Sequence, residues 1–162
     1  MNSKDTLIAW LRDAYAMEQN AAQMLDQAGK TEGMPPGMEA RVRQHIDQTH
    51  RHAQLVEECL HRLDSDTSGA KTAVGKVSGF MSGFTAGMHS DAIVKQCLAG
   101  YAMEHFEIAC YRSLVAAAEA LGEEQVAQTC RRILAGEQEF ASWVESQIPE
   151  VTQQYLAEHA TH

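Results

Sequence analysis

Apolar residues recur every three to four positions over most of this chain, and no window alternates apolar and polar residues as a β-strand does. Only three prolines interrupt these stretches. Side chains three or four positions apart share one face of a helix, so the pattern predicts long amphipathic helices. We expect an all-α fold in which residues 1–162 form a single domain, an antiparallel four-helix bundle.

Capping residues and helix breakers set the expected limits of the four long helices. These limits are a Ser3 cap to about Gly29, about Met38 to Leu63, a Ser90–Asp91 cap to Leu121, and about Glu123 to Gln147. Gly122 is a natural helix stop, and the segment 29–37 is expected to be a loop. Pro149 is expected to end the last long helix, so that residues 150–159 form a short C-terminal helix.

The middle of the chain is expected to connect two helical hairpins. Its glycines are four apart, at Gly75, Gly79, Gly83 and Gly87, and the segment is predicted to be a short, loosely helical crossover. The tetrapeptide YAME occurs at Tyr15–Glu18 and again at Tyr101–Glu104. Because each copy lies in the first helix of a pair, the repeat favours a duplicated hairpin.

Charge and cysteine usage exclude several classes of protein. A net charge of -9 with 13 Lys plus Arg argues against nucleic-acid binding. No stretch resembles a signal peptide or a membrane span, so we expect a cytoplasmic protein that does not bind membranes. The cysteines have no CxxC spacing and are interpreted as buried free thiols.

Four glutamates interrupt the apolar stripes near the middle of their helices, and this is the strongest functional signal. They are Glu18, Glu104, Glu107 and Glu137. A carboxylate inside a bundle is costly unless it is protonated, paired or bound to a metal, and the stripes carry almost no Lys or Arg. Carboxylates gathered from several bundle helices suit hard divalent cations, so the pattern predicts a metal site.

The second helix supplies the nitrogen ligands of this predicted site. His52 and His45 lie on its apolar stripe, and we favour His52 first. His50 points away from the stripe, as does Asp47. Gln48 lies on the flank, from which it can reach inward as a weak oxygen ligand or as a hydrogen-bond donor to a ligand. The remaining histidines are expected to be solvated: His61, His89, His105, His159 and His162.

Several strings resemble the YciF-like branch of the ferritin-like superfamily, that is, bacterial YciE/YciF-type proteins of undefined function. They are AYAMEQN, HIDQTHRHAQLVEECL, YAMEHFEIACYRSLVAAAEALG and GEQEFASWVESQIPEVTQQYL. The resemblance implies a ferritin-like bundle with a potential di-metal centre, a homodimer, and a link to stress responses. It places Glu18, the Glu104/Glu107 pair and Glu137 in the centre, with His52 where relatives often have His or Gln.

Two departures from the family pattern bear on how completely this centre can be loaded. Gln48 stands where some relatives have Glu, and Ala141 stands where an acid is common. The expected function is metal binding at a carboxylate-bridged di-iron or di-manganese site, with stress-related oxidoreductase chemistry. Two iron ions are expected, with manganese or zinc as alternatives.

The alternative function is a non-catalytic, stress-associated helical dimer with a degenerate metal site, so enzymatic activity is left open. Iron storage would need a cage, and nothing in the sequence indicates one. The apolar residues Phe80, Met81 and Phe84 of the Gly-rich connection add to the expectation of a dimer.

Overall fold

The computed structural model of this protein describes residues 2–31, 34–70 and 91–160. These ranges contain helices α1 (Ser3–Ala28), α2 (Pro36–Arg62), α4 (Ala92–Ala120) and α5 (Glu124–His159), and no strand. The predicted all-α four-helix architecture is confirmed. The expected crossover helix lies outside the described residues, as do the apolar residues Phe80, Met81 and Phe84.

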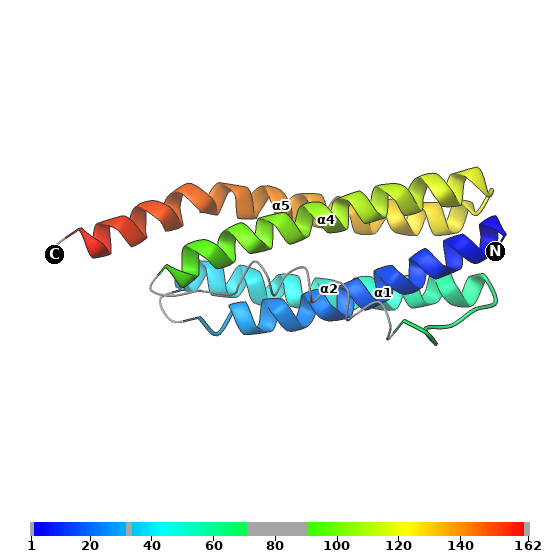
Figure 1. Ribbon diagram of the computed structural model, residues 1–162, viewed down its shortest axis with the longest axis horizontal. Helices are drawn as coiled ribbons and strands as arrows, with labels where there is room; N and C mark the ends of the chain where they lie inside the picture. Colours follow the sequence, from blue (N-terminus) through cyan, green and yellow to red (C-terminus); the bar gives the residue numbers. More distant parts are fainter. Residues whose placement is uncertain (1, 32–33, 71–90, 161–162) are drawn as a thin grey trace.

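The four helices form two antiparallel hairpins that pack against each other (Figure 1). Helix α1 contacts α2 and α4, and α5 contacts α4 and α2. Helices α2 and α4 begin at the same end of the bundle and run in parallel (Figure 1). The end of α2 and the start of α4 therefore lie at opposite ends of the bundle, as a pair of hairpins joined by a long connection requires.

Two helices begin earlier than the sequence pattern predicts. The N-cap of α1 is Asn2 and not Ser3: Asn2 Oδ1 accepts from the Asp5 N–H at 2.9 Å, while Asp5 Oδ2 accepts from the Asn2 N–H at 3.1 Å. This reciprocal capping box explains the earlier start. Helix α2 begins at Pro36 inside the expected loop, because proline suits the first turn, where no N–H is needed. Gly122, with φ +72°, follows α4 as predicted.

The expected break at Pro149 is wrong, because α5 continues through this residue to His159. Proline removes one backbone donor and normally kinks a helix, but Pro149 lies on the exposed face, where water can reach the freed carbonyl. Just beyond it, Val151 is buried and packs in a cluster with Phe140 and Val144, which holds the helix on the bundle. There is therefore no separate C-terminal helix, and the end of α5 extends past the other helices (Figure 1).

Two apolar clusters fill the bundle on either side of a polar layer. The larger cluster includes Val56 of α2 and Ile133 of α5, and the smaller one includes Val42 of α2 and Phe140 of α5. The buried polar residues of these two helices lie in the sequence between those positions.

The four cysteines are free thiols, as predicted, with Cys59 and Cys130 buried. Within the described residues, no helix has the length and apolar character needed to cross a membrane.

Candidate metal centre

All four helices contribute a buried acid or histidine to the polar layer. Helix α1 contributes Glu18, α2 contributes His45 and His52, α4 contributes Glu104 and Glu107, and α5 contributes Glu137. None of these side chains is more than 4% exposed. The helical period placed each of them on an apolar stripe, so core packing against their neighbours carries them into the bundle.

Five of these residues form two groups. Within each group, the potential ligand atoms all lie within 4.8 Å of one another. The His52 group consists of Glu18, His52 and Glu137, and the His45 group consists of His45, Glu104 and Glu137. Glu137 belongs to both groups. Each group therefore combines one imidazole with carboxylates, the donor set that suits borderline to hard divalent metals.

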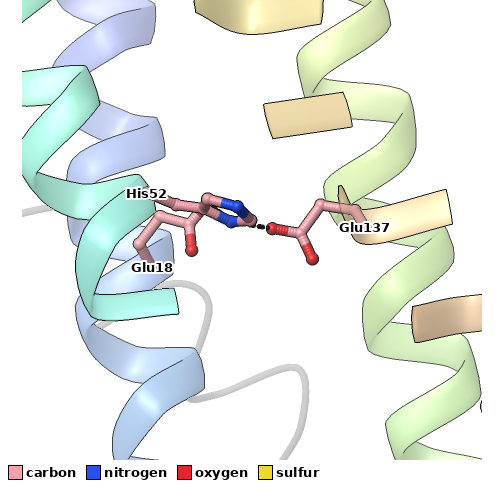
Figure 2. A group of neighbouring side chains, drawn as sticks. All are labelled: Glu18, His52 and Glu137. Atoms are coloured by element: carbon pink, nitrogen blue, oxygen red, sulfur yellow. Dashed lines mark hydrogen bonds and ion pairs between the residues drawn. The ribbon is translucent and has the colours of Figure 1, made fainter. Parts of the chain in front are cut away.

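In the His52 group, Nδ1 of His52 donates to Glu137 Oε1 at 2.6 Å and lies 3.9 Å from Glu18 Oε1. Figure 2 shows His52 and Glu137 facing each other from opposite hairpins, with Glu18 beside the histidine.

In the His45 group, Nε2 of His45 lies 3.4 Å from Glu104 Oε1 and 3.5 Å from Glu137 Oε2. The two oxygens of Glu137 thus face different histidines. A carboxylate in this position is able to bridge two adjacent cations.

Five buried polar atoms in the layer have no hydrogen-bond partner within the described residues. They are Glu18 Oε2, His45 Nε2, Glu104 Oε2, Glu107 Oε1 and Glu137 Oε2. Leaving such atoms unpaired in the interior costs free energy, and native structures do so rarely. Four of them belong to residues of the two ligand groups, so cations bound there would satisfy these four together. The residues present therefore fit a metal centre.

The electrostatics of the polar layer also favour a bound cation. Burial raises the pKa of Glu18, Glu104 and Glu107 well above the ordinary value, and neighbouring carboxylates raise it further. Burial is the largest single influence on the pKa of Glu137 and raises it, but the hydrogen bond from His52 and the charges of His52 and His45 together outweigh burial and lower this pKa. Without a cation, protons must neutralise most of these acids, and a divalent cation would displace those protons.

Three neighbouring side chains hold His45 and Glu18 in place. Nδ1 of His45 donates to Gln48 Oε1 at 3.3 Å, which leaves the Nε2 lone pair facing the carboxylates. The ring of Phe140 stacks on the His45 ring at 3.5 Å, and burial lowers the pKa of His45 to about 4. The Tyr111 hydroxyl, which is fully buried, donates to Glu18 Oε1.

Tyr111 is not among the predicted site residues, because the helical pattern places it on the apolar stripe of α4. A usable signal was present: Tyr111 lies four residues after Glu107 on a buried face, and a buried phenol needs an acceptor.

Most of the predicted site residues belong to one of the two ligand groups, but Glu107 and Gln48 do not. Glu107 is buried beside the other carboxylates and belongs to neither group among the described residues. Gln48 contacts His45 from the flank, but its Oε1 accepts from Nδ1 of His45, whereas a donor was expected. His50 is exposed, so the predicted orientation of the second helix is correct. The role of these residues as metal ligands stays a prediction.

The other expectations about histidines and Ala141 can also be checked in part. His61, His105 and His159 are exposed, while His89 and His162 lie outside the described residues. Ala141 is buried in α5, one turn after Glu137, and offers no ligand atom there.

Comparisons with known proteins agree with the geometry of this fold. The pattern of the family described as "Domain of unknown function (DUF892)" matches residues 2–157. A protein of known structure from Xanthomonas campestris pv. campestris is 32% identical, with a TM-score of 0.83 and coverage of 99% of both chains.

Two more distant structures share the fold. A Desulfovibrio desulfuricans bacterioferritin, whose di-iron site was seen in different catalytic states, is 23% identical, with a TM-score of 0.72 over 98% of this chain and 90% of that chain. The E. coli stress protein YciF is 16% identical, with a TM-score of 0.65 over 100% and 99%. The ferritin-like fold is therefore confirmed, and YciF shares it.

Proposed function

The chain belongs to the DUF892 family, and we propose that it is a ferritin-like metal-binding protein with a carboxylate-bridged di-iron centre. The observation that carries the proposal is the position of Glu137, whose two oxygens face the two histidines of separate ligand groups. The buried polar atoms without partners support it, because four of the five belong to residues of these two groups.

The two ligand groups correspond to two half-sites, each of which would hold one ion. Glu18 and His52 would hold one ion, Glu104 and His45 would hold the other, and Glu137 would bridge them. Two ferrous ions, when bound, would supply two electrons, enough to reduce O₂ to peroxide or peroxide to water, and would become ferric. The surrounding apolar clusters exclude water, and the donated hydrogen bond from Tyr111 orients Glu18.

Glu107 has a different part in this proposal. Its carboxyl group is fully buried, and the pKa is raised by burial and then by the charge of Glu104. It would hold a proton when the centre is empty, and it would supply further negative charge when both ions are bound. The choice of iron over manganese or zinc is supported by the likeness in fold to a bacterioferritin that has a di-iron site.

Elemental analysis of protein purified without chelators, with a visible-region spectrum, tests this function. We expect close to two iron ions per chain. Glu137→Gln should lose both, because the amide keeps the shape of the side chain and cannot bridge two cations as an anion. Glu150→Gln, which neutralises an exposed acid on the same helix, should retain both. A wild-type protein that takes up no metal when iron, manganese or zinc is added would reject the proposal.

A second candidate function is a non-catalytic, stress-associated helical dimer with a degenerate site. The presence of Gln48 and of the buried Ala141, neither of which supplies a charged ligand, favours it. In that case the buried acids would stay protonated and the purified protein would be free of metal. A homodimer and a cytoplasmic location are proposed under both functions.

A further inference from the structure

Gly136 lies in α5 directly before Glu137, at a point where α2 approaches closely. It is buried, and its φ is not in the left-handed region that glycine is needed for at Gly69 and Gly122. Glycine is unfavourable inside a helix when the backbone does not require it. The absence of a side chain at Gly136 therefore has to be explained by space.

Two side chains of α2 occupy that space. A Cβ atom at position 136 would lie 2.5 Å from Nε2 of Gln48 and 3.2 Å from both Cε1 and Nε2 of His52. The first distance is far below van der Waals contact, and the second is tight. No added side chain fits unless Gln48 moves and the His52 ring yields.

Each of these two side chains is connected to a different half-site: Gln48 contacts His45, and His52 is itself the histidine of the other. Gln48 accepts from Nδ1 of His45, whose Nε2 faces Glu104 and Glu137. His52 turns its Nε2 edge to Gly136 and its Nδ1 to Glu137. The gap at Gly136 thus borders both nitrogen donors, one directly and one through an amide.

We infer that Gly136 is a positioning residue for both half-sites: its missing side chain lets the Gln48 amide and the His52 ring take the places from which the two histidines face Glu137. The inference rests on the proposed metal centre. It assigns no contact between Gly136 and an ion. Residues that orient metal ligands typically change affinity about 10- to 100-fold when they are replaced.

Gly136→Ala and Gly100→Ala form a matched pair. Gly100 lies inside α4 with nothing within 4 Å of an added Cβ, so alanine there adds a methyl group without a contact. Co²⁺ titration of the metal-free protein, followed by visible absorption and elemental analysis, gives affinity, stoichiometry and coordination. We expect Gly136→Ala to bind Co²⁺ at least about 10-fold more weakly, with a changed spectrum, and Gly100→Ala to match the wild type.

A second variant keeps the inference testable if Gly136→Ala does not fold by circular dichroism. Gln48→Ala adds no atom between the helices and removes the acceptor from His45, so it should also weaken Co²⁺ binding. In the variant that carries both Gly136→Ala and Gln48→Ala, the loss of Co²⁺ binding free energy should be smaller than the sum of the two single losses. Both substitutions act partly through the contact between position 136 and Gln48.

The outcomes separate this inference from the proposed function. Equal Co²⁺ affinity in the wild type and Gly136→Ala would overturn the role of Gly136 and leave the metal centre standing. Fully additive losses would overturn the shared contact with Gln48, as would an unchanged affinity in Gln48→Ala. A wild type and Gly100→Ala that both fail to bind Co²⁺ would overturn the metal centre, and this inference with it.

Discussion

Oε1 of Glu137 lies 2.6 Å from Nδ1 of His52, and Oε2 of the same carboxyl group lies 3.5 Å from Nε2 of His45. The two histidines are on α2, in the first hairpin, and Glu137 is on α5, in the second. One carboxylate thus connects two ligand groups that draw on both hairpins. Their other acids, Glu18 and Glu104, are the last residues of the two YAME repeats, so the repeat marks equivalent positions in the two groups.

The two neighbouring histidines His52 and His50 allow a direct test of the ligand assignment. His52→Ala should lose metal while the bundle stays helical, because it removes the nitrogen donor that faces Glu137. His50→Ala removes an exposed side chain and should leave the metal content unchanged. Metal stoichiometry and circular dichroism are compared for both variants. Equal retention of metal would remove His52 from the site.

Glu107→Gln should stabilise the metal-free protein at neutral pH. Burial raises the pKa of Glu107 above its ordinary value of 4.5, so the folded state binds more protons than the unfolded state between 4.5 and the raised pKa. The stability of the metal-free wild type should therefore fall as pH rises through this window.

The substituted amide carries no charge to be buried, so the variant should lose this part of the pH dependence. In a chain of this size, a gain of about 1 kcal/mol raises Tm by about 2–4 °C. Thermal melts at pH 5 and pH 8 with chelator measure the difference. A variant that melts below the wild type at both pH values would contradict the electrostatic account.

Tyr111→Phe should weaken metal binding without unfolding the protein. The phenol donates to Glu18 Oε1, and removing it frees the carboxylate to rotate in the core. We expect affinity to fall about 10- to 100-fold, as for other residues that orient ligands. Tyr155→Phe, near the end of α5, is the control. If both tyrosine variants bind Co²⁺ as the wild type does, Tyr111 has no part in positioning Glu18.

The protein should be a homodimer in solution. The described residues expose several large apolar side chains, among them Trp10 at 44% and Leu156 at 60%, which a monomer would leave in water. Light scattering should give about twice the chain mass of 17.9 kDa. A monomer mass that persists at high concentration would be the contrary result.

The helical period was enough to place the buried acids and histidines, because burial in a bundle follows from the angle around the helix axis. It separated His52 from His50 correctly for that reason. The period could not show that the two oxygens of Glu137 face different groups, since that depends on how two hairpins dock. Nor could it show that Gly136 makes room for Gln48, because that contact joins residues far apart in the sequence.

The continuation of α5 through Pro149 also depends on contacts between residues far apart in the sequence. Local propensity predicts a break at this residue, whereas the packing of Val151 against the bundle decides the outcome. Tertiary contacts outweigh the helix-breaking tendency of Pro149 here, and the sequence of α5 alone does not predict these contacts.

The most direct test of the bridged centre is a crystal structure of the protein grown with ferrous iron, with anomalous diffraction measured at the iron absorption edge. The account predicts two anomalous peaks per chain, one beside each oxygen of Glu137, with His52 at one ion and His45 at the other. A single peak, or peaks away from Glu137, would contradict it.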